Sequence, residues 1–296
     1  MGLLQFNYRS RILGYYVNIS VAYPTDNVGI ASLTESDTAL QKPDDIMKPG
    51  MKFQTVYLIH GGGDEDTLTY RYTNAERYAQ KNRVMLVTPG IPNSFGADSG
   101  YGVSYMRFLT EELPQVVQSY FASSPKREDN FVMGYAMGGN VALAMAMMHP
   151  ELYKACVDMS GGIGYTLSTD NMVRELEGDH FRNRFYRFNA TFGEAKDFPG
   201  SRHDLYPIVK KHIEEGRELT DLTILCGDKE FIRARVEEDV RILKELNYPV
   251  KYVCAEGYDH DFDCWDHFIR VALDEWLPLK RHILYPEASQ KTGTEE

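Results

Sequence analysis

Residues 131–140 constrain the fold of this chain more than any other stretch. They consist of an apolar strand-like segment that runs into Gly-x-Ala-x-Gly-Gly and continues as a long apolar helix-like segment. Glycines must flank the centre of such a sharp turn, because the strand and helix backbones pass too close there for side chains. The residue at the apex, Ala136, is held above the edge of a sheet, where an attacking hydroxyl would be useful. We therefore interpret position 136 as a nucleophile site that lacks its serine.

Strand-like and helix-like segments alternate along the 296 residues, and no linker divides them, which predicts a single α/β domain over residues 1–296. Strands are expected at 15–23, 55–59, 84–87, 131–135, 155–159, 222–226 and 250–254. Helices are expected at 68–81, 104–121 with a break at Pro114, 140–149, 231–246 and 265–276. This order predicts a mostly parallel central sheet with helices on both faces and with its ligand site at the carboxyl ends of the strands.

Residues 164–203 interrupt this alternation and contain a group of aromatic residues that includes Phe181, Phe185, Tyr186, Phe188 and Phe192. We interpret the segment as a small cap insertion that borders a substrate pocket, because aromatic side chains provide an apolar wall for an acyl or phenolic group. The alternative is an ordinary helical excursion that buries its own aromatic residues.

Composition limits the partners of the chain. A net charge of -11 argues against nucleic acids and anionic membrane surfaces, because both repel an acidic protein. The N-terminus has no basic segment followed by an apolar one, and no apolar run is long enough to span a membrane, so a cytoplasmic protein is expected. The sequence leaves open a secreted form whose leader has been removed. It also leaves the oligomeric state open, a homo-oligomer included.

Neither a metal nor a nucleotide cofactor is predicted. The four cysteines lack CxxC spacing and are expected to be buried free thiols. Asp259, Asp261 and Asp263 resemble the opening of a calcium loop, but Cys264 replaces the required glycine and Arg270 the closing glutamate.

Two later segments supply the partners of a nucleophile in the order acid, then histidine. His260 follows the strand expected at 250–254, so we interpret it as the general base that takes and returns the proton. Glu230 and Asp228 both follow the strand expected at 222–226 and are both candidates for the acid that orients the histidine. We favour Glu230, because a position three residues past Gly227 reaches further towards the histidine.

The glycine-rich turn at 60–63 follows the strand expected at 55–59 and is a candidate oxyanion hole. Gly62 is expected to supply one backbone N–H group and Met137 the other. No Lys-Ser/Thr pair follows this turn, so it is not a phosphate-binding loop. Substrate contacts are expected from His60, Gly61, Tyr135, Phe185 and Trp265.

Taken together, these motifs resemble the esterase D-type α/β-hydrolases, which include tributyrin and acetyl esterases and the feruloyl and acetyl-xylan esterases of carbohydrate esterase family one. The residues that carry the resemblance span most of the chain: Leu13 and Gly14, 57–62, 111–114, 134–139, 227–230, and 257–265 with His260, Asp261, Phe262 and Trp265. The resemblance implies the α/β-hydrolase fold. It also implies Ala136 as the nucleophile position, His260 as the base, and Glu230 where the family usually has aspartate.

Two functions follow from these observations. The first is a serine carboxylic ester hydrolase that acts through an acyl-enzyme on short acyl or hydroxycinnamoyl (feruloyl) esters, with esters of carbohydrates favoured. The chain would then be an inactive Ser-to-Ala form of this enzyme. The second is a natural non-catalytic binding protein that has kept the pocket. We favour the first, because the acid, the histidine and the oxyanion turn are all retained around one missing oxygen.

Overall fold

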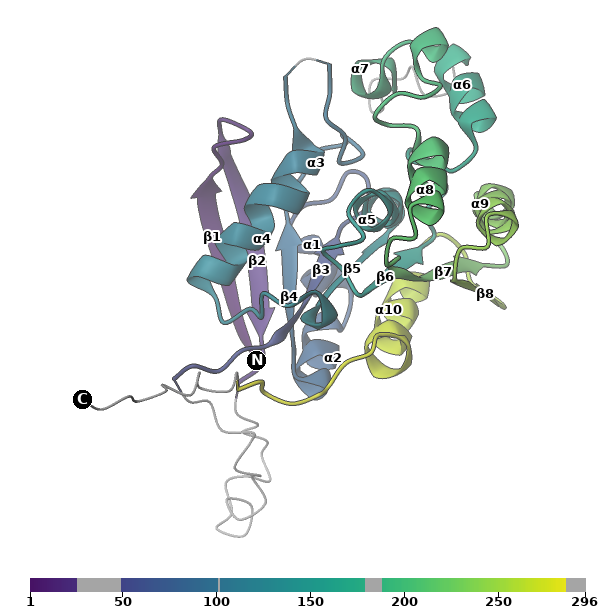
Figure 1. The fold of residues 1–296 in the computed structure, drawn as a ribbon. Helices are drawn as coiled ribbons and strands as arrows, with labels where there is room; N and C mark the ends of the chain where they lie inside the picture. Colours follow the sequence, from purple (N-terminus) through teal and green to yellow (C-terminus); the bar gives the residue numbers. More distant parts are fainter. Residues whose placement is uncertain (26–48, 101, 179–187, 286–296) are drawn as a thin grey trace, which may run out of the picture.

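The computed structural model describes residues 1–25, 49–100, 102–178 and 188–285 (Figure 1). Its eight strands form one sheet in the order β1-β2-β4-β3-β5-β6-β7-β8. The strands are β1 (Gly2–Arg9), β2 (Tyr16–Tyr23), β3 (Gln54–Ile59), β4 (Val84–Pro89), β5 (Asn130–Tyr135), β6 (Ala155–Met159), β7 (Asp221–Gly227) and β8 (Val250–Ala255). The last six run parallel, whereas β1 pairs antiparallel with β2 and β2 antiparallel with β4.

The central strands are continuous apolar runs because helices cover them on both sides. Every residue of β3, β4, β5 and β6 is buried. The register sets Gly134 of β5 opposite both Ile59 of β3 and Asp158 of β6, so the segments that follow these three strands start at the same edge of the sheet. The predicted mostly parallel sheet is therefore confirmed, and the segment predicted at 15–23 is β2.

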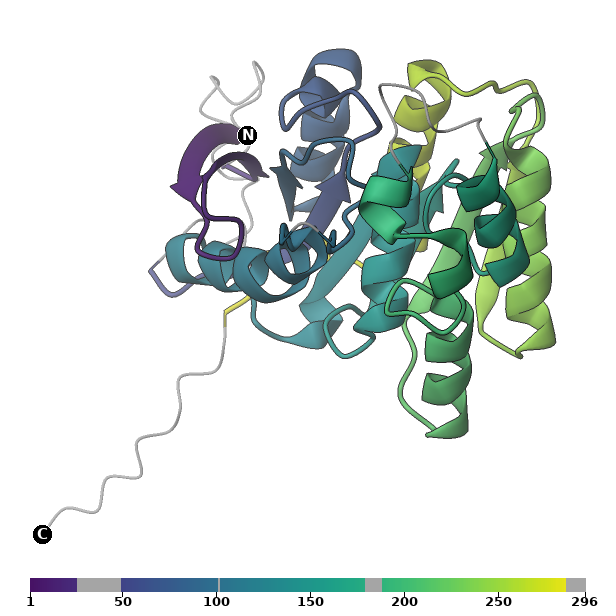
Figure 2. The ribbon, with the colours of Figure 1, turned by 90° about the horizontal axis from the view of Figure 1, so that it is seen from above.

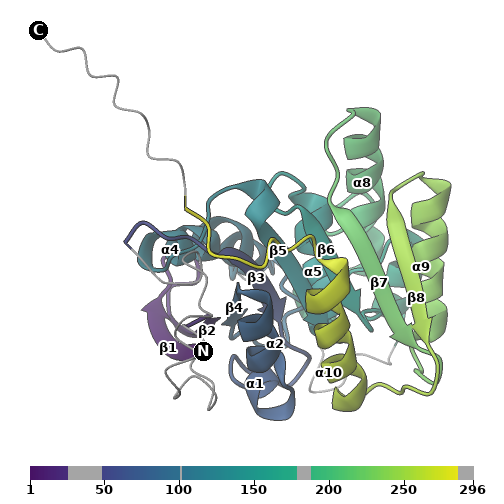
Figure 3. The ribbon, with the colours of Figure 1, turned by 90° about the horizontal axis from the view of Figure 1, so that it is seen from below.

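Two layers of helices enclose the sheet. Helices α1 (Leu68–Tyr72), α2 (Ala75–Asn82) and α10 (Phe262–Val271) cover one face (Figure 3). Helices α4 (Leu113–Tyr120), α5 (Met137–Met148), α8 (Leu205–Glu214) and α9 (Arg233–Glu245) cover the other (Figure 2). Helix α5 is apolar almost all round because the sheet and α8 bury it, and only Met148 is not fully buried.

The predicted elements differ from the structure in several places. Strand β1 was not predicted, because its side chains are mostly exposed and its pairing with β2 depends on backbone hydrogen bonds. The helix predicted at 68–81 is two helices, α1 and α2. The segment predicted as a helix at 104–121 consists of α3 (Tyr105–Arg107), a π-helical turn at Phe108–Glu112 and α4. Pro114 lies in the first turn of α4. The helix continues through this point, since Leu113 donates its backbone N–H to the carbonyl oxygen of Phe108, and the wider π-helical turn accommodates a following proline that has no N–H to donate.

The predicted cap segment contains α6 (Thr169–Glu177) and α7 (Phe188–Phe192), which lie together beyond α8 (Figure 1). Its described aromatic residues pack on one another and on Phe95. The ring centroids of Phe188 and Phe192 lie 5.5 Å apart, and they lie 4.8 and 5.9 Å from the ring centroid of Phe95. Phe192 also makes edge contacts with Tyr165 and His203. The other predicted aromatic residues, Phe181, Phe185 and Tyr186, lie outside the described residues.

Three of the four cysteines are buried free thiols, as expected, but Cys254 is exposed. The expectation was wrong for Cys254 because β8 lies at the edge of the sheet and is only half covered. Within the described ranges, no helix is long and apolar enough to cross a membrane.

Candidate active site

The turn between β5 and α5 places Ala136 in a strained backbone conformation. Its φ of 50° and ψ of -123° lie outside the regions that alanine ordinarily adopts. A Cβ on Gly138 would lie 2.1 Å from the carbonyl oxygen of Ile59, and one on Gly134 would lie 2.1 Å from that of Gly138, so both glycines are required. Such strain of about 1–3 kcal/mol persists at functional sites where the surroundings enforce it. The apex residue, Ala136, thus has the backbone of a nucleophile elbow without a nucleophile.

His260 and Glu230 meet beside this apex. His260 Nδ1 lies 2.8 Å from Glu230 Oε2, and the glutamate side chain is fully buried whereas the imidazole is one-fifth exposed. The second carboxylate oxygen, Oε1, accepts hydrogen bonds from the backbone N–H of Gly227 at 2.6 Å and from the Ser160 hydroxyl at 2.7 Å. The carboxylate is thus fixed on one side by the protein and directed at the imidazole on the other.

Asp228, the alternative acid, lies elsewhere in the same turn. Its Oδ1 accepts a hydrogen bond from the backbone N–H of Gly257 at 2.8 Å, which ties the end of β7 to the turn after β8. Between the two sequence candidates, the structure therefore brings Glu230, and not Asp228, to His260.

The glycine-rich turn and the start of α5 present backbone donors at the apex. Gly61, Gly62 and Met137 line the same cavity as Ala136. Among the described residues, no acceptor pairs with the N–H group of Gly62 or with that of Met137. Unpaired N–H groups at a helix N-terminus can stabilise a developing oxyanion.

His60 supports this turn from behind. The side chain is fully buried, its Nδ1 lies 2.8 Å from the carbonyl oxygen of Gly61, and its Nε2 accepts a hydrogen bond from the N–H of Ile91 at 3.1 Å. Burial lowers the pKa of His60, which favours a neutral ring with its proton on Nδ1. His60 therefore positions the turn and, contrary to the sequence-based expectation, does not line the cavity.

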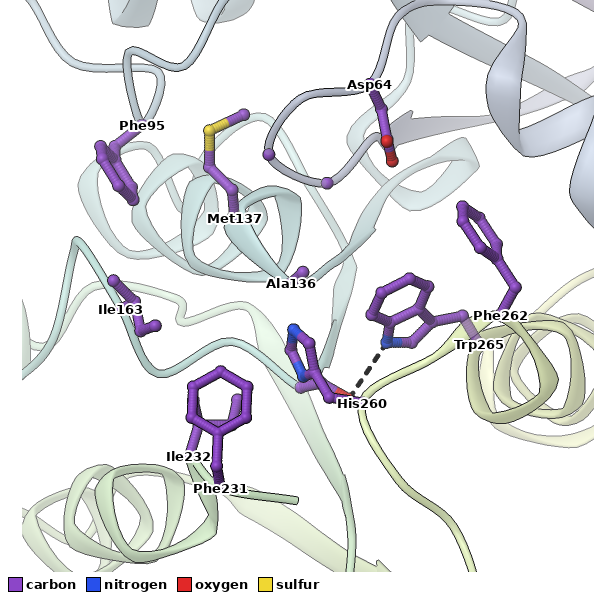
Figure 4. Close-up of a pocket in the computed structure, with 13 residues that line it drawn as sticks. Asp64, Phe95, Ala136, Met137, Ile163, Phe231, Ile232, His260, Phe262 and Trp265 are labelled. Carbon is purple, nitrogen blue, oxygen red and sulfur yellow. Dashed lines mark hydrogen bonds between the residues drawn. The ribbon is translucent and has the colours of Figure 1, made fainter. Parts of the chain in front are cut away.

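A cavity of about 460 Å³ opens above Ala136 (Figure 4). Its wall is mostly apolar and includes the rings of Phe95, Phe231, Phe262 and Trp265 together with Met137, Ile163 and Ile232. The polar side chains in the wall are those of Asp64, Ser160 and His260, and no lysine or arginine of the described chain lines it. Burial raises the pKa of Asp64, which accepts a hydrogen bond from the Tyr135 hydroxyl at 3.0 Å.

The residues expected to contact substrate fall into three groups. Gly61 and Trp265 line the cavity, and His260 packs edge-on against Trp265 with ring centroids 5.1 Å apart. Tyr135 is fully buried and stacks behind Trp265 at 4.8 Å, so it supports the wall rather than forming it. Phe185 lies outside the described residues.

Several wall residues were not predicted from the sequence. Ser160 follows directly after β6, and that position at the carboxyl end of a strand was the available signal. Phe231 is 72% exposed although it lines the cavity, and Asp64 lies just after the glycine-rich turn at 60–63. Nothing in their sequence context distinguishes these two from ordinary turn residues. In the described ranges, no group of three or more His, Cys, Asp or Glu side chains is placed to hold a metal ion.

Comparisons with known proteins agree with this geometry. The chain is 25% identical to an acetyl esterase from Caldicellulosiruptor saccharolyticus over 94% of this chain and 98% of that protein. It is 29% identical to an S-formylglutathione hydrolase from Bos taurus over 61% of this chain and 57% of that protein. Among solved structures it is similar to FphF, a fluorophosphonate-binding serine hydrolase from Staphylococcus aureus, with a TM-score of 0.75, 27% identity, and coverage of 92% of this chain and 96% of that one.

The fold is accordingly that of the α/β-hydrolases. The model of one family, described as "Putative esterase", matches residues 34–271, which is most of the chain. On this match the chain belongs to the Esterase family.

Proposed function

We propose that this site is built to hydrolyse carboxylic esters through an acyl-enzyme, and that the chain with Ala136 binds such esters without turning them over. The observation that carries the proposal is the 2.8 Å contact between His260 Nδ1 and the buried Glu230 carboxylate beside the elbow apex. A carboxylate in that place holds the imidazole in the tautomer that leaves Nε2 free to accept a proton.

With serine at position 136, each retained group has a defined role. The hydroxyl attacks the acyl carbon while His260 takes its proton, and the resulting oxyanion accepts hydrogen bonds from the N–H groups of Gly62 and Met137. His260 then returns the proton to the leaving alcohol, and water releases the acid in a second round of the same steps. Of these groups, the chain with Ala136 lacks only the serine hydroxyl.

The cavity wall favours a neutral ester with a short acyl or aromatic group. Aromatic rings surround the space above Ala136, and among the described wall residues Asp64 is the one carboxylate while no lysine or arginine is present. Acetyl and feruloyl groups fit such a wall, and the exposed ring of Phe231 offers a platform for a sugar ring in the alcohol.

Replacing Ala136→Ser tests the proposal. Loss of the serine nucleophile costs roughly 10⁶ in kcat in a well-studied protease, so the variant should hydrolyse p-nitrophenyl acetate or methyl ferulate several orders of magnitude faster than the Ala136 chain. It should also release p-nitrophenol in a burst and be inactivated by a serine-directed organophosphate. The double variant Ala136→Ser, His260→Ala is the control, and it should show neither property.

The second candidate is a natural binding protein, and the observation that favours it is Ala136 itself, held in an elbow that retains its strain. If the folded Ala136→Ser variant stays inert towards both esters and towards the organophosphate, this candidate replaces the hydrolase. In both cases the Ala136 chain is expected to bind ester, which calorimetry with methyl ferulate can measure.

A further inference from the structure

We propose that Ser160 is the positioning residue that allows a glutamate to serve as the acid of this site. The proposal rests on the ester-hydrolase function proposed above. It starts from the identity of the acid: a glutamate has one more rotatable bond than an aspartate, so its carboxylate must be anchored more firmly to hold one orientation. In this structure the anchor lies on the oxygen that does not face His260.

The hydroxyl of Ser160 is itself directed at that oxygen. Trp265 donates its indole N–H to Ser160 Oγ at 3.3 Å, so the hydroxyl is an acceptor towards the indole (Figure 4). The single hydroxyl proton then goes to Glu230 Oε1 at 2.7 Å. Trp265, Ser160, Glu230 and His260 thus form one continuous chain of hydrogen bonds from the cavity wall to the imidazole.

The backbone of Ser160 also points to a functional constraint. Its φ of 61° is in the left-handed region, which a non-glycine residue rarely adopts, and its N–H is fixed to the carbonyl oxygen of Leu225 at 2.8 Å. Glycine would adopt this backbone without strain, so serine is here at a cost in stability. The side chain is 1% exposed, and its hydroxyl is what a glycine would lack.

Two substitutions separate the hydroxyl from the backbone strain. Ser160→Ala removes the hydroxyl and keeps the strain, whereas Ser160→Gly removes both and is expected to fold at least as stably as the parent. Asn247→Gly is the matched control, because Asn247 has a φ of 56° on an exposed turn after α9, remote from the residues that line the cavity.

The first measurement uses the Ala136 chain and needs no catalysis. A histidine Nδ1–H that donates to a carboxylate gives a proton NMR resonance at low field, and His260→Gln identifies it by its loss. Both Ser160 variants should broaden this resonance or shift it towards higher field, and Asn247→Gly should leave it unchanged. A resonance unchanged in both Ser160 variants would overturn the proposal, whatever the activity of the Ala136→Ser variant.

The second measurement uses the Ala136→Ser background. Ser160→Ala should lower kcat by about 10- to 100-fold with little change in KM, since the hydrogen bond that is lost goes to a charged group. In a Glu230→Asp background the shorter side chain no longer reaches Ser160, so Ser160→Ala should change kcat by less than about twofold. Equal losses in the glutamate and aspartate backgrounds would show that Ser160 does not act through Glu230.

Discussion

At the scale of single residues, short turns determine the directions of the side chains that form the site. Glu230 folds back onto its own turn, because Gly227 donates its backbone N–H to the carboxylate, and this leaves the other oxygen for His260. Asp228, two residues earlier, is directed at the turn after β8 instead. The two carboxylates follow the same strand in the sequence but make different contacts in the structure.

We predict that in the Ala136→Ser background Glu230→Gln lowers kcat for p-nitrophenyl acetate by roughly 10⁴, because the imidazole loses the acid that fixes its tautomer. Asp228→Asn keeps an acceptor for the N–H of Gly257 and should change kcat by less than about threefold. The reverse ranking of the two variants would assign the role of the acid to Asp228.

Asp64 should set the charge preference of the cavity. In the Ala136→Ser background, Asp64→Asn is predicted to raise kcat/KM for the anionic p-nitrophenyl monoester of succinic acid relative to p-nitrophenyl acetate. The expected gain is about tenfold, or ~1.4 kcal/mol, because the substitution removes a like charge from a partly desolvated wall. The gain should shrink at high salt. An equal effect of Asp64→Asn on the two esters would contradict this assignment.

At the scale of elements, the elbow depends on the close approach of β3, β5 and α5. Gly138→Ala would place a Cβ 2.1 Å from the carbonyl oxygen of Ile59 and 2.5 Å from that of His60, both of which are backbone atoms that cannot move aside alone. We predict that it lowers the free energy of unfolding by about 3 kcal/mol or more, in the range seen for severe steric strain in a core.

Urea unfolding followed by circular dichroism measures this loss. The control is Gly100→Ala, because the added Cβ has no atom within 4 Å and the backbone does not need a positive φ. It should change the unfolding free energy by less than about 0.5 kcal/mol. A folded Gly138→Ala protein with parental stability would mean that the two elements are further apart than described.

At the scale of the whole molecule, two buried carboxyl groups link stability to pH. Burial raises the pKa of Asp158 from 3.8 to about 7 and that of Asp239 from 3.8 to about 8. Each pKa is higher in the folded state than in the unfolded state. Each group therefore makes its full contribution to stability below its unfolded-state pKa and loses that contribution as the pH rises through its folded-state pKa. Stability should therefore fall by about 1.4 kcal/mol per pH unit for each group across these ranges.

Asp239→Asn tests this dependence, because asparagine can still accept the hydrogen bond that Leu167 donates at 2.9 Å. Relative to the parent, the variant should gain stability steadily between about pH 4 and pH 8, the window between the ordinary pKa and the raised one. Urea unfolding at intervals of one pH unit gives the comparison. Parallel stability curves for parent and variant would show that Asp239 does not titrate in this way.

The elements whose signal is local could be predicted from the sequence. Periodicity and turn chemistry depend on neighbouring residues, so three features could be recognised from the sequence. These are the apolar runs of β3, β4, β5 and β6, the glycines of the elbow, and the order of the candidate acid and histidine after later strands. The same local signals place Ala136 at the apex of the elbow.

How those segments meet depends on tertiary contacts. Glu230 rather than Asp228 faces His260, His60 lies behind the turn rather than in the cavity, and Ser160 joins Glu230 although 70 residues separate them. Strand β1 likewise depends on its pairing with β2, since its own side chains are mostly exposed. The physical reason is common to all four cases: hydrogen bonds between distant segments depend on the register of the sheet and on backbone angles in the turns, and neither leaves a pattern in neighbouring residues.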